Sequence, residues 1–76
     1  MNILVTGAGG GIAQGVIKSL KMIEDISIKI IAADANKLAS GLYSANKSYI
    51  LPKYNSTSFK EKLVKILLDE KIDYYI

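Results

Sequence analysis

The chain has 76 residues, enough for one small domain, and a chain of that length buries only about 60% of its unfolded surface in a marginal core. Its net charge of +3 comes from ten lysines spread along the whole sequence, which is typical of a solvated surface and not of a nucleic-acid-binding patch. The absence of cysteine and histidine excludes disulfides, thiolate metal sites and, in practice, a zinc site.

No apolar run approaches the roughly 20 residues that a membrane-spanning helix needs, and no charged leader region precedes the first apolar segment. We therefore expect a cytoplasmic protein that binds neither membranes nor nucleic acid. Because the core is marginal and no covalent or metal staple is available, we also expect a neighbouring part of a larger protein to stabilise it.

The spacing of apolar residues changes after residue 6, and this predicts the first two elements. Residues 2–6 (NILVT) predict a strand buried on both faces, as in a parallel sheet. Residues 11–22 then predict a helix with helical spacing of apolar residues. The expected apolar stripe is Ile12, Val16, Leu20 and Ile23. Gly15 lies inside this helix at a cost of about 1 kcal/mol relative to alanine, which close packing against a strand would offset.

Two further strands are predicted in the middle of the chain. Residues 26–34 (ISIKIIAAD) predict a second strand that ends on an acid, and residues 35–47 read as an irregular connection. Residues 48–52 (SYILP) predict a short third strand, which Pro52 stops because proline cannot donate to a strand ladder.

The second helix has the clearest start signal. Ser58 and Glu61 have the spacing of a capping box, and we expect Ser58 to stabilise this helix by about 1 kcal/mol. The predicted apolar stripe is Phe59, Leu63, Ile66 and Leu67. Residues 73–76 (DYYI) predict a fourth strand, inside which the sequence stops.

This alternation of strands and helices predicts an α/β domain, a Rossmann-like parallel sheet with flanking helices, over residues 1–76. Because the last strand has no turn and no helix after it, we expect the chain to be the truncated, opening part of that domain.

The glycine-rich segment VTGAGGGIAQG, residues 5–15, is the candidate binding element. In a parallel sheet it lies at the carboxyl edge, where a helix N-terminus offers backbone N–H groups to a phosphate or carboxylate. The electrostatic gain is about 0.3 to 1 kcal/mol at an exposed site, so it does not select one anion. The candidate residues for substrate or phosphate binding are Gly7, Ala8, Gly9, Gly10, Gly11 and Asp34. The alternative is that these glycines serve only a positive φ and close packing, with no ligand.

Nucleotide motifs fit this segment only in part. The Walker A pattern is excluded because Val16 occupies the position of its obligatory lysine, and the fingerprint G-x-G-x-x-G fails at Ile12. A looser G-x-x-G-x-x-G/A pattern of extended dehydrogenases fits at three positions: Gly7, Gly10 and Ala13. Asp34, some 20 residues beyond the loop, is placed either to bind a ribose or to cap the next turn.

No catalytic constellation is present. There is no histidine for general base chemistry and no cysteine nucleophile, and the seven acids are scattered. Tyr43 and Lys47 have the Tyr-x-x-x-Lys spacing of short-chain dehydrogenases, but they lie too early in the chain, in the irregular connection, and we interpret this as chance. No catalytic or metal-ligating residue is assigned.

Residues 32–55 (AADANKLASGLYSANKSYILPKYN), together with residues 1–21, resemble the amino-terminal, pre-ATP-grasp domain of ATP-grasp proteins related to the carbamoyl-phosphate synthase large chain. The similar features are an acid that ends the second strand, Asp34, the segment 41–45 (GLYSA), and a third strand that closes on Pro52. The resemblance covers essentially the whole chain, and its most specific part is residues 34–52.

The resemblance implies a Rossmann-like domain that presents its glycine loop and Asp34 to a small-molecule carboxylate substrate or its acyl-phosphate. It implies that ATP and Mg²⁺ are held by later ATP-grasp domains, the missing partners of this chain, in a ligase that joins a carboxylate to an amine or ammonia. These residues alone are then an inactive fragment, with no cofactor expected. The chain has no arginine to bind a carboxylate through a two-pronged contact, which leaves the substrate open.

Two other functions stay open at this point. One is the NAD(P)-binding Rossmann module of an extended short-chain dehydrogenase-like oxidoreductase, with Gly7, Gly10 and Ala13 on the pyrophosphate and Asp34 on the ribose. The other is a non-catalytic sugar-nucleotide or interaction module.

Overall fold

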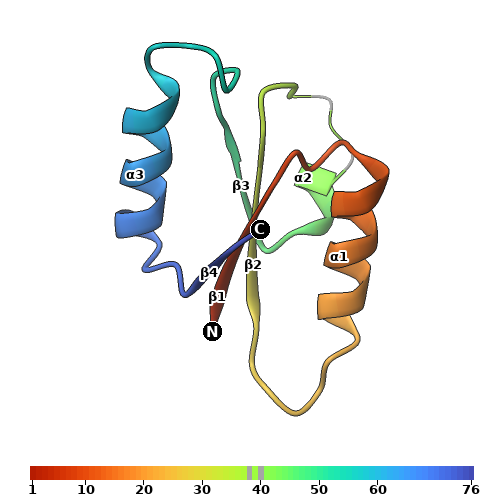
Figure 1. Ribbon diagram of the computed structural model, residues 1–76. Coiled ribbons are helices and arrows are strands. Elements are labelled where there is room, and N and C mark those ends of the chain that lie inside the picture. The colour runs from red at the N-terminus through yellow and green to blue at the C-terminus, as the bar shows by residue number, and fades with distance from the viewer. Residues whose placement is uncertain (38, 40) are drawn as a thin grey trace.

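A parallel sheet lies at the centre of the molecule, with helices on both faces (Figure 1). The computed structural model describes residues 1–37, 39 and 41–76, without the side chain of Tyr43. In chain order the elements are β1 (Asn2–Thr6), α1 (Gly11–Lys21), β2 (Lys29–Asp34), α2 (Gly41–Ser44), β3 (Lys47–Ile50), α3 (Phe59–Asp69) and β4 (Tyr74–Tyr75). The described strands lie in the order β3-β2-β1-β4, and every neighbouring pair is parallel. The predicted Rossmann-like α/β class is confirmed.

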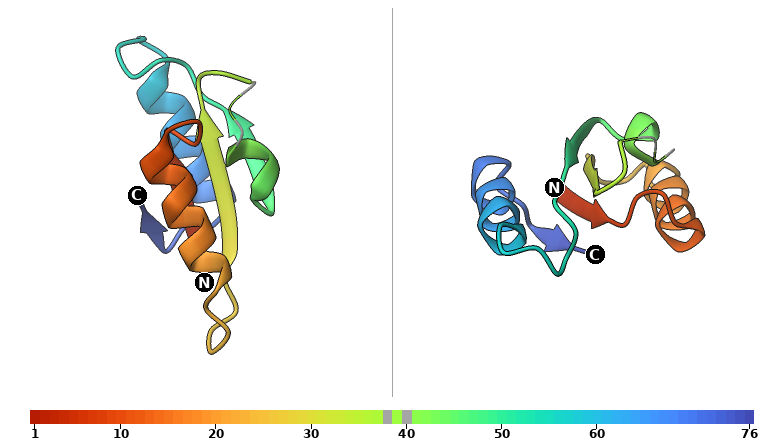
Figure 2. Two further views of the ribbon diagram at one scale, coloured as in Figure 1. Left: turned by 90° about the vertical axis from the view of Figure 1, so that its right-hand side faces the viewer. Right: turned by 90° about the horizontal axis from the view of Figure 1, so that it is seen from above.

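Helices α1 and α2 cover one face of the sheet and α3 covers the other, as the two views of Figure 2 show. Strand β1 is buried on both faces, because Ile3 and Val5 pack towards α1 while Leu4 packs towards α3. This is why residues 2–6 form a nearly continuous apolar run and not an alternating one.

The buried face of α1 differs from the predicted stripe. Ala13 and Ile17 are the buried residues of this helix, whereas Ile12 is 88% exposed and Ile23 lies beyond the helix end and is 45% exposed. Val16 and Leu20 are partly buried against the same core. The helix approaches the sheet through the small side chain of Ala13, and this rotates Ile12 into solvent.

The predicted stripe of α3 is confirmed. Ile66 is buried, and the other three members, Phe59, Leu63 and Leu67, pack partly buried against the core on that face. The predicted capping box is wrong: Ser58 precedes the helix with helical backbone angles, φ −90° and ψ −4°, and its side chain makes no capping hydrogen bond. Its Oγ lies 3.1 Å from Oγ of Ser56 instead, so the expected capping stabilisation is absent.

Other bounds differ by a few residues from the predicted ones. Strand β2 begins at Lys29 and not at residue 26, and β3 covers Lys47–Ile50 and not residues 48–52. The connection predicted as irregular contains the short helix α2. Of the Tyr43–Lys47 pair, the side chain of Tyr43 lies outside the part that the structure describes.

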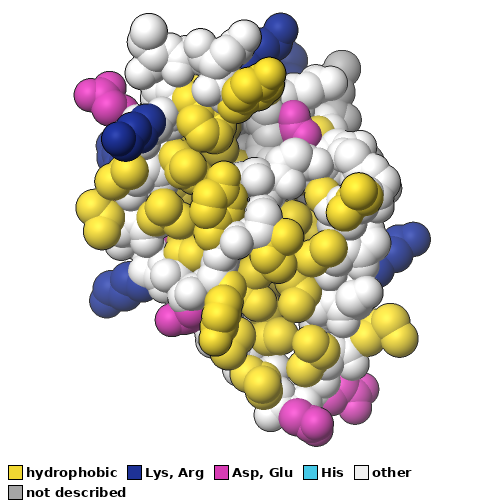
Figure 3. Space-filling model, in the orientation of Figure 1, with side chains coloured by type: hydrophobic (Ala, Val, Ile, Leu, Met, Phe, Trp, Pro, Cys, Tyr) yellow, Lys and Arg dark blue, Asp and Glu magenta, His cyan; other side chains and the backbone are white. Residues whose placement is uncertain are grey.

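Strand β4 is apolar on both faces and yet about half exposed. Tyr74 pairs with Ile3 and Tyr75 with Leu4, so the two tyrosines face opposite sides of the sheet. Tyr74, Tyr75 and Ile76 are 59%, 50% and 53% exposed. Seen from the direction of Figure 1, apolar side chains gather in a band down the middle of the molecule, and most charged side chains lie at the borders of that band (Figure 3).

The amino edge of the sheet is held by charges around Glu70, whose side chain is only 6% exposed at the end of α3. One carboxylate oxygen accepts from Nζ of Lys29 at 3.3 Å, and the other lies 2.6 Å from Nζ of Lys47 and accepts from the Tyr49 hydroxyl. Nδ2 of Asn2 donates to the Glu70 backbone carbonyl at 2.8 Å. The starts of β1, β2 and β3 are thereby tied to α3.

We predict that Glu70→Gln lowers stability at neutral pH and flattens its acid dependence. Lys47, then Tyr49 and Lys29, lower the pKa of Glu70 from 4.5 to about 2 by hydrogen bonding. Because the folded-state pKa is the lower one, the stabilisation is complete above pH 4.5 and is lost as the pH falls towards 2. Urea unfolding from pH 7 to pH 3 measures this, with the exposed Glu61→Gln as the matched control. Equal acid sensitivity of both variants would contradict the assignment.

We predict that Gly15→Ala stabilises the protein by about 0.5 to 1 kcal/mol. The expected close packing of Gly15 is wrong: a Cβ built there has nothing within 4 Å, so alanine gains helix propensity without a clash. The urea midpoint measures the change. Gly7→Ala is the control and should lower the midpoint, because φ at Gly7 is +63° and alanine is strained there by about 1 to 2 kcal/mol. A lower midpoint for Gly15→Ala would show that this helix face is covered.

Candidate functional site

The topology places the candidate site at the carboxyl edge of the sheet, beside β1. The chain moves from β1 through β2 to β3 on one side and then returns to place β4 on the other side of β1. In open parallel sheets, ligands bind outside the carboxyl ends of the strands at such a reversal point. Thr6, Gly7 and Ile76 lie there, and the amide and hydroxyl of Thr6 both donate to the Ile76 carbonyl, at 2.9 and 3.1 Å.

A cleft of about 410 Å³ opens at this edge on the α3 side. Five segments contribute: the end of β1, the end of β2, residues 51–55 after β3, the start of α3, and strand β4. Apolar side chains, among them Leu51, Phe59 and Tyr75, form part of its wall. Two charged side chains, Asp34 and Lys53, line it as well.

The carboxylate of Asp34 joins the glycine loop to the turn after β2. One oxygen accepts from the Gly9 amide at 2.8 Å and the other from the Asn36 amide at 2.9 Å. The Asn36 amide does most to lower the pKa of Asp34, burial opposes it, and the amides of Gly9 and Ala35 add to the lowering. The turn-capping interpretation of Asp34 is present in this geometry, and its role in binding a ligand stays a prediction.

The glycine loop folds tightly onto the strand ends. The amides of Ala8, Gly9 and Gly10 donate to the Ala33 carbonyl at 3.3 Å, the Asp34 carboxylate at 2.8 Å and the Gly7 carbonyl at 2.9 Å. A larger residue at Gly9 would be crowded, because a Cβ there would lie 3.0 Å from Cβ of Ala39 and 3.3 Å from Oδ2 of Asp34. Helix α1 begins at Gly11 without a side-chain cap.

The structure brings the predicted residues Gly7, Gly9 and Asp34 together at one edge, and Gly7, Gly10 and Gly11 line a second hollow on the α1 side. That hollow is about 350 Å³ and mostly apolar, with Ile12, Val16 and Ile76 among its walls. Whether the loop binds a ligand stays a prediction.

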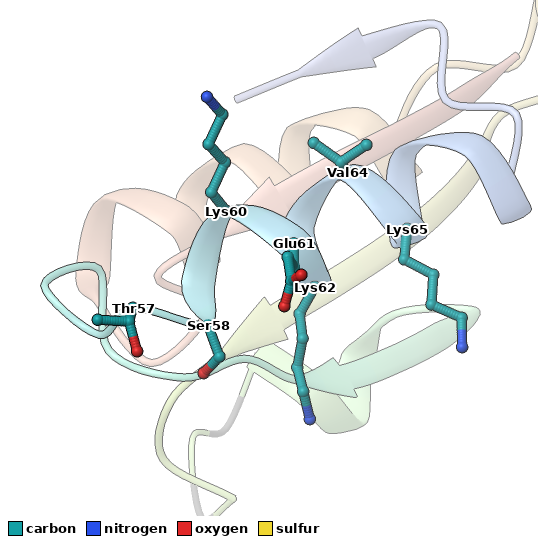
Figure 4. Close-up of a pocket in the computed structure, with 7 residues that line it drawn as sticks. All are labelled: Thr57, Ser58, Lys60, Glu61, Lys62, Val64 and Lys65. Carbon is teal, nitrogen blue, oxygen red and sulfur yellow. The ribbon is translucent and has the colours of Figure 1, made fainter.

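A broader hollow of about 970 Å³ lies over the outer side of α3, and Figure 4 shows the seven residues that line it. All of them come from residues 57–65, and their side chains point away from the helix in different directions. Among the described residues no second element lines this hollow, so the surface lacks the walls that hold a small ligand.

Lys53, Tyr54 and Asn55 were not among the predicted site residues, although they follow Pro52 and line the cleft opposite the glycine loop. The signal was available, because residues directly after a parallel strand lie at the carboxyl edge. Within the part of the chain that the structure describes, no helix is long and apolar enough to cross a bilayer.

A family model described as "PylC-like, N-terminal domain" matches residues 3–76, which is nearly the whole chain. No curated protein matches the sequence.

We predict that Asp34→Asn destabilises the protein by about 1 to 2 kcal/mol and speeds hydrogen exchange of the Gly9 amide. The side chain of asparagine has one acceptor oxygen, so it cannot accept from both the Gly9 and the Asn36 amides as the two carboxylate oxygens do. The pKa of Asp34 is lowered below 3.8, so its contribution is present above that pH and lost as the pH falls further. Urea unfolding at pH 7 and hydrogen exchange measure both effects. Asp69→Asn, at the exposed end of α3, serves as the control, and unchanged protection of Gly9 in Asp34→Asn would refute the bridging role.

Proposed function

The chain belongs to the PylC-like N-terminal domain family, a pre-ATP-grasp-type domain, and from that premise we propose that it is the substrate-side domain of an ATP-grasp ligase. The enzyme joins a carboxylate to an amine or to ammonia through an acyl-phosphate. The family match over residues 3–76 carries this proposal, and the cleft at the carboxyl edge of the sheet supports it.

The finer resemblance, to the carbamoyl-phosphate synthase large chain, is part of the proposal. It rests on the region where Asp34 ends β2, a short helix at Gly41–Ser44 follows, and Pro52 comes after β3. Of these features, Asp34 and Pro52 line the cleft, and α2 lies on the other face of the sheet beside α1 (Figure 2).

ATP and Mg²⁺ are held by other domains in this proposal. The described residues contain no group of three or more acidic side chains that could hold a metal ion. The amides of Ala8, Gly9 and Gly10 are also occupied by internal acceptors, so they do not form a phosphate cradle as the loop stands. The chain's own part is to position the carboxylate in the cleft and to limit water there with apolar walls.

The partners of this chain are the ATP-grasp domains of the same enzyme, and β4 offers a surface for them. Both backbone groups of Ile76 bond to β1, through the Leu4 carbonyl at 2.8 Å and the Thr6 amide at 2.9 Å. Residues alternate sides along a parallel ladder, so the backbone groups of Tyr75 face the open edge. An apolar strand with an unprotected edge is suited to being covered. We place the enzyme in the cytoplasm, where ATP is supplied.

The NAD(P) alternative is not favoured. Residues 3–76 match a family of ATP-grasp type, and both oxygens of Asp34 already accept backbone amides of this chain, so its carboxylate serves the glycine loop and the turn after β2. The pyrophosphate would also need the Gly10 amide, which donates to the Gly7 carbonyl.

A domain exchange tests the proposal. Residues 1–76 replace the corresponding domain of an ATP-grasp ligase that carries a PylC-like N-terminal domain, and ADP release is measured with a carboxylate, an amine and Mg²⁺-ATP. We expect ADP release from the folded chimera and none from the enzyme that lacks the domain. Gly9→Ala, which crowds Ala39 and the Asp34 carboxylate, should lower the rate at least about tenfold, while Lys62→Gln on the outer side of α3 should leave it unchanged.

Two results would count against the ligase role. One is a folded chimera that binds ATP and releases no ADP with any carboxylate and amine offered. The other is saturable binding of NADH to the 76-residue chain, followed by fluorescence, which would restore the dehydrogenase alternative.

A further inference from the structure

We propose that Lys53 is the residue that anchors the anionic group of the ligand in the cleft at the carboxyl edge, in place of the glycine-loop amides. The ligand class is a small molecule with a carboxylate or a phosphoryl group. The inference rests on one part of the proposed function, namely that the substrate occupies this cleft. It does not depend on the ligase reaction.

The glycine loop is poorly placed to hold an anion in this cleft. Its amides at Ala8, Gly9 and Gly10 already donate within the protein. The acceptor of the Gly9 amide is the Asp34 carboxylate, whose negative charge lines the same cleft. An anion beside Gly9 would therefore meet a like charge and an amide that already donates to it.

Lys53 supplies the opposite charge. Among the described residues that line the cleft it is the one cationic side chain, and the ion pairs formed within the described chain do not involve it. Lys29 and Lys47, by contrast, are both committed to Glu70 at the other edge of the sheet. The Lys53 ammonium is thus available to a ligand.

The backbone around Lys53 is held in place on both sides. Leu51 is buried and its amide donates to the Asp34 carbonyl at 3.0 Å, while the Lys53 carbonyl accepts from the Ser56 amide at 2.8 Å. Pro52, between them, has a fixed φ. The lysine therefore projects from a constrained turn, which reduces the ordering cost of binding.

The surroundings strengthen a charge pair at this position. Lys53 is an exposed residue of the cleft lining, and Phe59, Leu51 and Tyr75 form apolar walls on the cleft side, where they exclude part of the water that would screen an ammonium–anion contact. The sequence has no arginine, so a lysine is the strongest available cation for an oxyanion.

The test uses the 76-residue chain labelled with ¹⁵N, titrated at low ionic strength with acetate in one series and inorganic phosphate in another. We expect saturable amide shifts in residues 53–55 and in Thr6 and Gly7. Lys53→Gln should weaken binding by about 5- to 10-fold, and Lys53→Arg should restore it. Lys62→Gln, on the outer side of α3, is the matched control and should bind as the natural chain does. The two series show which anion is preferred.

Three outcomes would overturn the inference: no saturable binding of either anion, equal binding by the Lys53→Gln and Lys62→Gln variants, or shifts confined to residues 11–13 at the start of α1. None of these bears on ADP release by the chimera, so the failure of Lys53 as the anchor is distinguishable from the failure of the ligase role. Conversely, binding that depends on Lys53 would stand even if the chimera released no ADP.

Discussion

Strand β1 is buried on both faces, and this determines how the other elements are arranged around it. Ile3 and Val5 must be covered by α1, and Leu4 must be covered by α3, so the chain has to place helices on opposite sides of one sheet. With parallel strands, this arrangement puts β2 on one side of β1 and β4 on the other. The order in which strands are added to the sheet therefore reverses beside β1. The cleft at the carboxyl edge is a consequence of that reversal.

The two edges of the sheet have different chemistry. At the amino edge the buried Glu70 is satisfied by Lys29, Lys47 and Tyr49, and those charges serve stability. At the carboxyl edge Asp34 binds the glycine loop, and a cleft with one cation remains open next to it. Lysines that look equivalent along the sequence therefore have separate roles, which the topology assigns by placing residues at strand starts or strand ends.

Helices and strands with a regular spacing of apolar residues could be predicted from the sequence. The buried face of a helix and its cap could not, where they depend on how that helix packs against its neighbours. The strand at residues 2–6 and the stripe of α3 follow from apolar spacing alone. The face of α1 does not, because Ala13 contacts the sheet more closely than Ile12 can, and spacing rules give a small residue little weight. The cap at Ser58 failed for a similar reason: its backbone angles are set by the preceding turn, and a motif does not contain them.

The α/β class, the parallel sheet and the position of the glycine loop at its carboxyl edge follow from the sequence, because hydrophobic period and glycine placement are local properties. That Asp34 accepts from the Gly9 amide and that Lys53 lines the same cleft is seen only in the folded chain. These residues are brought together by strand order, and hydrogen bonds between groups distant along the chain depend on that order and not on any local pattern.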